Sequence, residues 1–215
     1  MSPTRQINPT TFALTGLLAI RSWTAYELAN QMRRALRWAW PRSEANVYSE
    51  IKRLVPLGLA GSAEEDNAGR TRTRYQITDD GRTALGEWLR TEPAPVQVQF
   101  ETLLRVFLAD LGTKQELVDA LTTTRAQVVQ AIDDLLPIVE DYAGDEPPFP
   151  GRAHLNVLFI HFIANFLREV LQWCDDAEAE VATWDGTADV GLTPGTRRMV
   201  EEARAFYRGV VATGR

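Results

Sequence analysis

The sequence predicts a mainly α protein with one small β-hairpin, in two modules at residues 1–92 and 96–215. Apolar residues recur at helical spacing along most of the chain, and only one stretch, residues 59–78, alternates as a strand pair does. A Pro-Ala segment, TEPAPVQ at residues 91–97, marks the boundary. The charge changes there too: 13 basic residues face 9 acidic ones before position 91, and 10 face 20 after it.

Composition bounds the class of protein. The 215 residues are 45% hydrophobic and 24% charged, as in a soluble globular chain. A single cysteine excludes an internal disulfide and fits a reducing compartment. The N-terminus lacks a signal-peptide pattern, and the longest apolar stretch, LNVLFIHFIANFL, is 13 residues broken by polar side chains. We therefore expect a cytoplasmic protein without a membrane partner.

Three helices open the first module. NPTTFALTGLLAI begins with Asn8 as N-cap and Pro9 at the first helical position. The second helix starts at Thr24 and Glu27, which have the spacing of a capping box. The third should run from about residue 43 to 55, because Pro56 cannot continue a helix.

A hairpin and a fourth helix follow. Asp66, Asn67 and Gly69 form the expected turn, and the strand after it, RTRTRYQI, places arginines on alternate positions. The fourth helix should begin at Thr78. Three helices, a hairpin and a helix are the element order of a winged helix-turn-helix.

This order predicts DNA binding. A recognition helix needs an apolar back, here Val47, Ile51 and Leu54, and a polar or cationic front. A wing needs cations for phosphates. The candidate DNA-binding residues are Asn46, Tyr48, Ser49, Lys52, Arg53, Arg70, Arg72 and Arg74. An ordinary surface helix and a charged edge strand that prevents aggregation remain the alternatives.

Three segments, TAYELANQM, VYSEIKRLVPLGLA and RTRYQITDDGRTALGEWL, resemble the PadR family of bacterial transcriptional regulators. The third-helix pattern falls on Tyr48, Ile51, Arg53, Leu54, Gly58 and Leu59, and the wing pattern on Tyr75, Ile77, Thr78 and Gly81. Pro56 and the tryptophan-rich RWAWPRS depart from the family pattern. The resemblance implies DNA binding, dimerisation through a C-terminal helical region and, in many members, a small aromatic effector.

The second module reads as helices throughout. A first helix should bury Phe100, Leu103, Leu104, Phe107 and Leu111. The next, with a capping box at Thr113 and Glu116, carries a heptad stripe that includes Leu117 and Leu121. This stripe fits either a dimer interface or an intramolecular helix pair. Pro137 should bend or end the helix.

A long helix, residues 153–184, is apolar almost all round in its first half, so a partner subunit should cover it. The expected dimer-interface residues are Leu155, Phe159, Phe162, Phe166, Leu117 and Leu121. An effector pocket could be lined by His161, Phe166 and Trp173, unless these rings only pack the dimer core. A final helix should start at Thr193 and Pro194.

Catalytic patterns are weak. His154 and His161 lack the partners of a metal site, Cys174 has no nearby base, and no glycine-rich phosphate loop occurs. We predict no enzyme, cofactor or metal, but a homodimeric repressor that binds a pseudo-palindromic operator. The alternative is a winged-helix module that binds protein without specific DNA binding, which the small positive charge of the first module favours.

Overall fold

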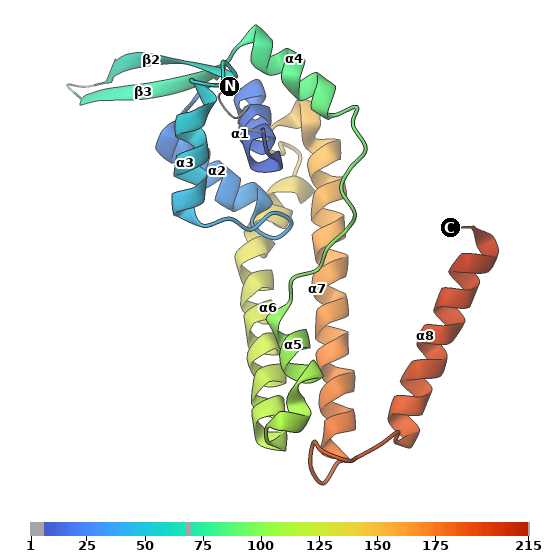
Figure 1. Cartoon of the computed structure of the whole chain (residues 1–215). Helices are drawn as coiled ribbons and strands as arrows, with labels where there is room; N and C mark the ends of the chain where they lie inside the picture. The colour runs from blue at the N-terminus through green and yellow to red at the C-terminus, as the bar shows by residue number, and fades with distance from the viewer. Residues whose placement is uncertain (1–6, 68–69, 215) are drawn as a thin grey trace, which may run out of the picture. The chain divides into compact units, whose positions relative to one another are not determined.

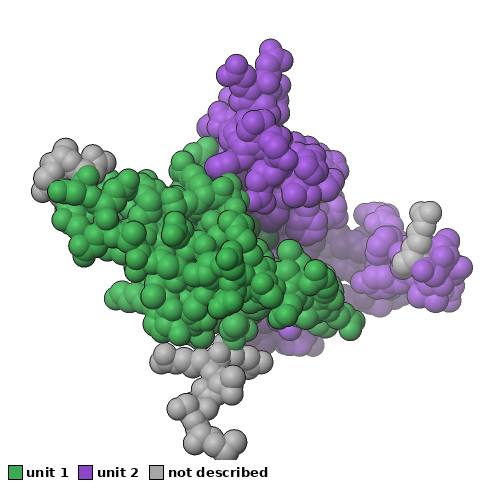
Figure 2. All heavy atoms as spheres, turned by 90° about the horizontal axis from the view of Figure 1, so that it is seen from above, with its two compact units in different colours: residues 1–96 green, residues 97–215 purple. Residues whose placement is uncertain are grey.

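The computed structural model describes residues 7–67 and 70–214. The chain forms two compact units, residues 1–96 and 97–215, which Figure 2 shows in separate colours. Unit 1 contains α1 (Pro9–Ile20), β1 (Trp23–Thr24), α2 (Ala25–Leu36), α3 (Glu44–Leu54), β2 (Ala60–Asn67), β3 (Arg70–Ile77) and α4 (Asp79–Trp88) (Figure 1). The predicted mainly α fold with a winged helix-turn-helix is confirmed.

Local capping sets where the helices of unit 1 begin. The Asn8 side chain accepts a hydrogen bond from the Thr11 amide at 3.0 Å, and Pro9 follows it in the first turn. Thr24 and Glu27 bond reciprocally as a capping box, and Ser43 caps α3. These predicted helix starts are confirmed, and α3 ends at Leu54, before Pro56.

Two glycines fix the passage from α3 into the sheet. Gly58 has a φ of 73°, which lets the chain reverse while the Leu59 amide bonds back to the Leu54 carbonyl at 3.0 Å. A β-carbon on Gly81 would lie 2.2 Å from the Leu59 carbonyl oxygen. Only glycine therefore lets α4 start so close to the end of this turn.

The sheet has three antiparallel strands in the order β1-β3-β2. β2 and β3 form the predicted hairpin, in register from Ala60 opposite Ile77 to Asn67 opposite Arg70. β1 pairs Trp23 with Tyr75 at the other edge of β3. Two residues are too few to show strand alternation, so β1 could not be predicted from the sequence.

The core of unit 1 is closed. Its fully buried apolar side chains of large size come from α1, α2 and α3 and are Leu14, Leu18, Leu28, Ile51 and Leu54. Trp23 is buried as well and donates its indole N–H to the Leu17 carbonyl at 3.0 Å. Phe12 stacks on Trp88, with ring centroids 5.0 Å apart, and so joins α4 to α1.

Unit 2 is helical in its described residues. It comprises α5 (Glu101–Phe107), the short 3-10 helix η1 (Ala109–Leu111), α6 (Lys114–Ala143), the 3-10 turn η2 (Pro150–Arg152), α7 (Ala153–Ala182) and α8 (Pro194–Thr213). The capping box at Thr113 and the start of α8 after Thr193 are as predicted.

α6 and α7 form an antiparallel helix pair. Lys114, at the start of α6, donates to the Ala182 carbonyl at 3.1 Å, and Tyr142, near its end, accepts from Asn156 at 2.6 Å. Arg125 forms ion pairs with Asp175 and Glu178 between these points. Of the two outcomes predicted for Pro137, the end of the helix is wrong, because α6 continues to Ala143, and a bend stays a prediction. Pro137 is exposed, where water can bind the carbonyl that a proline leaves unpaired.

The predicted burial of residues 100–111 is also wrong, except at Phe100, which is half-buried. α5 is one short helix, and Leu103, Leu104, Phe107 and Leu111 are exposed in the single chain. α5 is held instead on its polar side, where the buried hydroxyls of Thr102 and Thr124 lie 2.6 Å apart. Unit 2 thus leaves apolar side chains outside its own core.

Candidate nucleic-acid interface

α3 has two distinct faces. Val47, Ile51 and Leu54 are buried against the unit 1 core. Asn46, Ser49 and Lys52 are exposed on the other side, while Tyr48 is half-buried beside them. The helix therefore presents short polar groups and one cation, the chemistry that base edges and phosphates require.

Arg53 does not share this exposed face. Only 21% of its side chain is exposed, and its guanidinium contacts the Glu50 carboxylate with an Nη1–Oε1 distance of 2.6 Å. The Arg53 Nε atom is buried, and no hydrogen-bond partner for it occurs among the described residues. The DNA contact expected of Arg53 stays a prediction, and in the free chain its guanidinium is paired with a neighbouring carboxylate.

The wing arginines differ from one another. Arg72 is exposed, directly across the hairpin from Glu65. Arg74 is half-buried, with its Nε 2.7 Å from a Glu65 oxygen, its Nη1 3.7 Å from Glu27, and a hydrogen bond to the Ser22 carbonyl. The hydrogen bond to Glu65 raises the pKa of Arg74. The predicted contact at Arg70 lies outside the described residues, because only its backbone is described.

The partner strand of the wing is acidic. Glu64, Glu65 and Asp66 follow one another on β2, and all three are exposed. Carboxylates repel phosphates at close range, so this strand lowers the positive potential that the arginines of β3 create. Arg74 binds the wing to the start of α2, and Arg72 is the better placed of the two for a phosphate.

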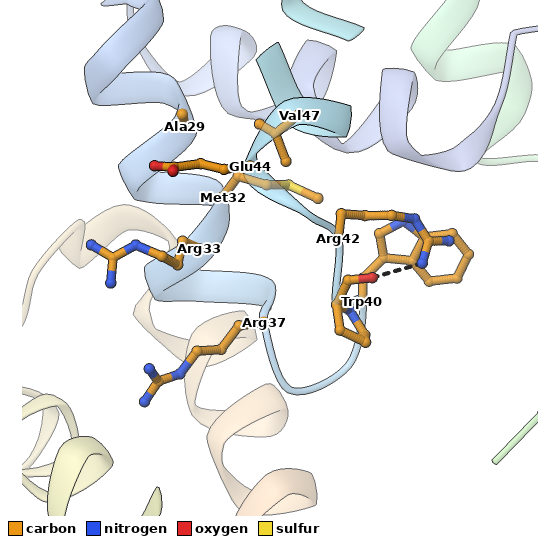
Figure 3. A pocket seen from close by; sticks show the side chains of 9 residues that line it. Ala29, Met32, Arg33, Arg37, Trp40, Arg42, Glu44 and Val47 are labelled. Atoms are coloured by element: carbon orange, nitrogen blue, oxygen red, sulfur yellow. Dashed lines mark hydrogen bonds between the residues drawn. The ribbon is translucent and has the colours of Figure 1, made fainter. Parts of the chain in front are cut away.

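A hollow of about 310 Å³ lies beside the beginning of α3 (Figure 3). Its lining combines side chains of α2, the loop before α3 and α3 itself: Ala29, Met32, Arg33, Arg37, Trp40, Pro41, Arg42, Glu44 and Val47. Trp40 donates its indole N–H to the Thr10 hydroxyl at 3.0 Å, and the Arg42 guanidinium stacks on the Trp40 ring at 4.3 Å. The tryptophan-rich loop is thus fixed to α1 just before α3 begins.

Sequence reasoning missed one polar cluster behind α3. Glu50 is buried, and its carboxylate accepts a hydrogen bond from the Thr11 hydroxyl at 2.7 Å. Glu50 lies between Val47 and Ile51 on the apolar face. An acidic residue at a core position of an amphipathic helix was the available signal, because such a group is buried only with partners.

The first half of α7 exposes the apolar residues expected at a subunit interface. The exposed fractions are 50% for Leu155, 68% for Leu158, 62% for Phe162 and 40% for Phe166. Phe159 is half-buried. Several apolar side chains of α6 are exposed as well, namely Val129, Ile132, Leu136 and Val139. An exposed apolar surface of this kind marks a site of association.

Leu117 and Leu121 do not belong to that surface. Both are buried inside unit 2, where they form a cluster with Val181 of α7. Their prediction as dimer-interface residues is wrong, and the heptad stripe serves an intramolecular helix pair. A heptad pattern specifies an apolar seam but not whether its partner is in the same chain.

The three residues predicted for an effector pocket lie in different surroundings. His161 is exposed on α7, as is Phe166. Trp173 packs against the Leu117 cluster and meets Phe100 edge-on, with ring centroids 5.6 Å apart. Trp173 therefore has a packing role within unit 2. No three metal-ligating side chains gather anywhere in residues 7–67 or 70–214.

One helical segment, residues 150–182, is long and apolar enough to cross a membrane by length and composition, contrary to the expectation from the sequence. The expectation rested on the 13-residue apolar stretch, whereas 18 consecutive residues of this helix are apolar on average and include at most two charged side chains. Only 17% of these residues are buried within the chain. A helix covered by a second subunit passes the same test of length and composition.

Two family models match the chain. Residues 15–87 match the transcriptional regulator PadR-like family, and residues 100–182 match the virulence activator alpha C-term family. The first match spans α1 to α4 of unit 1, and the second spans α5 to α7 of unit 2. No curated protein sequence matches the chain.

Solved structures show the same fold. Bacillus subtilis PadR in complex with operator DNA is 20% identical, with a TM-score of 0.68, over 80% of this chain and 99% of that one. The same protein with p-coumaric acid is 22% identical, with a TM-score of 0.59, over 82% and 99%. The Vibrio cholerae virulence activator AphA is 20% identical, with a TM-score of 0.59, over 80% and 98%. Residues 15–87 therefore belong to the PadR-like family of transcriptional regulators, which are DNA-binding proteins and not enzymes, and the chain shares the fold of the solved PadR structures.

Proposed function

We propose that the chain acts as a homodimeric repressor that binds a pseudo-palindromic operator. α3 enters the major groove, and Arg72 of the wing contacts the phosphate backbone. The observation that carries this proposal is the two-faced α3, with Asn46, Ser49 and Lys52 exposed over a buried apolar back. The same fold in Bacillus subtilis PadR is seen with operator DNA, which supports the assignment of that face.

Dimerisation rests on the exposed apolar residues of α7. A helix rarely leaves so many large apolar side chains in water, and a second copy would cover them. A two-fold dimer presents two α3 helices, so the matching DNA would contain two inverted half-sites. In this arrangement α7 is a subunit interface and does not enter a membrane, and the protein works in the cytoplasm.

A small aromatic effector is part of the proposal. Bacillus subtilis PadR has been solved with p-coumaric acid, and the aromatic part of α7, near His161 and Phe166, is where we place a ligand. A ligand changes DNA binding only if it binds the DNA-competent and incompetent dimers with different affinity. Titration of the protein–DNA complex with phenolic acids tests this part, since release of DNA is expected over the range in which the ligand binds.

The decisive experiment is binding to DNA from the chain's own promoter region. Fluorescence anisotropy at several salt concentrations should show tighter binding to this DNA than to a scrambled duplex of equal length. The logarithm of the affinity should fall linearly with the logarithm of salt. A reporter driven by the promoter should then lose expression when the protein is supplied, and an increase would assign activation.

A protein-interaction module is the second candidate function. The acidic strand β2 favours it, because Glu64, Glu65 and Asp66 reduce the attraction of the wing for DNA. The same titration separates the two functions. Equal, weak binding to promoter and scrambled DNA would favour a protein partner over an operator.

A further inference from the structure

Glu50 makes contacts on two sides within unit 1. Its Oε2 atom accepts the Thr11 hydroxyl of α1 at 2.7 Å, and its Oε1 atom accepts Arg53 Nη1 at 2.6 Å. The side chain of Glu50 is 8% exposed. The carboxylate therefore joins the buried side of α3 to α1 and also directs the guanidinium of Arg53.

A buried carboxylate is stable only when its partners replace the lost water. Burial alone would raise the pKa of Glu50, but hydrogen bonds from Thr11, Arg53 and Asn8, with the charge of Arg53, lower it overall. Glu50 is therefore ionised at neutral pH. Arg53 supplies the positive charge that this state requires, which explains why its guanidinium contacts Glu50.

Thr10, the residue before Thr11, holds the loop that leads into α3. Its hydroxyl accepts hydrogen bonds from Trp40 at 3.0 Å and from Arg42 Nε at 3.3 Å. Two adjacent threonines of α1 thus bind two parts of the chain, since Thr10 holds the loop before α3 and Thr11 holds the middle of α3. Hydrogen bonds are directional, so they restrict rotation and sliding of a helix more than apolar contacts do.

We propose that Glu50 is a positioning residue for DNA recognition, and that Arg53 is its counter-ion rather than a DNA contact. This inference rests on the proposed role of α3 in the major groove. A bidentate base contact tolerates little displacement, because hydrogen-bond length and angle are narrow. The orientation of Asn46, Ser49 and Lys52 toward bases would then depend on the Thr11–Glu50–Arg53 network behind them.

The first test compares salt dependence in the full-length chain. Arg53→Met should lower the preference for promoter over scrambled DNA by about tenfold or more, the equivalent of one base contact. Its salt slope should equal that of the parent, because no phosphate contact is lost. Lys52→Met, one position away on the exposed face, is the matched control, and its slope should fall by about 1 if it contacts a phosphate. A slope that falls by about 1 for Arg53→Met overturns the inference.

The second test uses compensation. Arg53→Met leaves Glu50 buried without its counter-ion, whereas the double variant Glu50→Gln/Arg53→Met removes both charges and keeps an acceptor for Thr11. The double variant should regain most of the preference for promoter DNA that Arg53→Met loses. A double variant no better than Arg53→Met would mean that Arg53 acts on DNA directly, and it would overturn the inference.

A third test changes Thr11 and leaves the charges of Glu50 and Arg53 in place. Thr11→Val removes the hydroxyl at nearly constant volume, and Thr11→Ser keeps it. We expect Thr11→Val to lose promoter preference and Thr11→Ser to retain it, both with the parent salt slope. Equal preference in the two variants would overturn the role of the network. A parent chain that does not distinguish promoter from scrambled DNA would instead remove the proposed function itself, which is a separate outcome.

Discussion

The two units of this chain bury their apolar residues to very different extents. Unit 1 surrounds Leu14, Leu18 and Leu28 completely with three helices and a sheet. Unit 2 has one seam between α6 and α7, and it leaves Leu158 and Phe162 exposed on α7. Two antiparallel helices can share only one face each, so an apolar surface all round α7 cannot be covered within the pair.

The difference indicates a division of tasks. Unit 1 closes its own apolar core, and its polar surface is available for recognition. Unit 2 leaves apolar side chains exposed, as the proposed dimer interface requires. Substitutions in one unit should therefore affect that unit and leave the other unchanged.

The largest effect is expected on α7. Phe162→Asp places a charge at the centre of the exposed apolar surface and would bury it unpaired in a dimer, at a cost of several kcal/mol. Sedimentation should give twice the 24.1 kDa chain mass for the parent and about that mass for the variant. Binding to the full operator should weaken with the loss of the second α3.

Ala164→Asp is the matched control, since it adds the same charge two positions away on the exposed part of α7. We expect the control to remain dimeric, which would tie the effect to the phenylalanine surface. A parent chain that sediments as a monomer at micromolar concentration would contradict the dimer and the two inverted half-sites together.

A core substitution in unit 1 should lower stability without changing the oligomeric state. Leu14→Ala creates a cavity in a fully buried site and should lower the free energy of unfolding by about 2–5 kcal/mol. Denaturant unfolding followed by circular dichroism measures this loss. The dimer should persist in the folded variant, so a change in sedimentation would show that the two units are not independent in this respect.

The sequence was most informative where a local rule decides the structure. The N-caps at Asn8, Thr24 and Thr193, the hairpin and the end of α3 before Pro56 follow from short-range chemistry, and they were predicted. Periodicity also identified Val47, Ile51 and Leu54 as the buried side of α3.

Prediction from the sequence failed where burial depends on which other segment an apolar residue packs against. The stripe with Leu117 and Leu121 packs within the chain, whereas Leu103 and Phe107 remain exposed, although all four residues looked alike in the sequence. The ion pairs of Arg74 with Glu65 across the hairpin and of Arg53 with the buried Glu50, three residues before it, were not predicted, because the spacing of charges does not show which side chains turn toward one another. A DNA contact of either arginine stays a prediction.

The front of α3 is expected to give an intermediate effect. Ser49→Ala removes a short polar group from the exposed face and should reduce discrimination between promoter and scrambled DNA by about 1–3 kcal/mol if it contacts a base. Stability should hardly change, because the residue is exposed and no core contact is lost. Competition anisotropy with both duplexes measures the difference, and an equal loss on both would assign Ser49 to the backbone.

The smallest effect separates the two wing arginines. Arg72→Ala should weaken binding to all DNA sequences alike and lower the salt slope by about 1, because a phosphate contact releases counterions whatever the sequence. Arg74→Ala should change the slope less, since Glu65 and Glu27 already neutralise its guanidinium. Its effect should appear instead in the position of the wing, through the lost bond to the Ser22 carbonyl.

The double variant Glu65→Gln/Arg72→Ala should bind DNA better than Arg72→Ala, because removing a carboxylate from the wing lowers its repulsion of phosphate. Equal slopes for Arg72→Ala and the parent would give Arg72 the role of a solubilising charge on the hairpin, and Arg72 would then add nothing to the DNA contacts of α3.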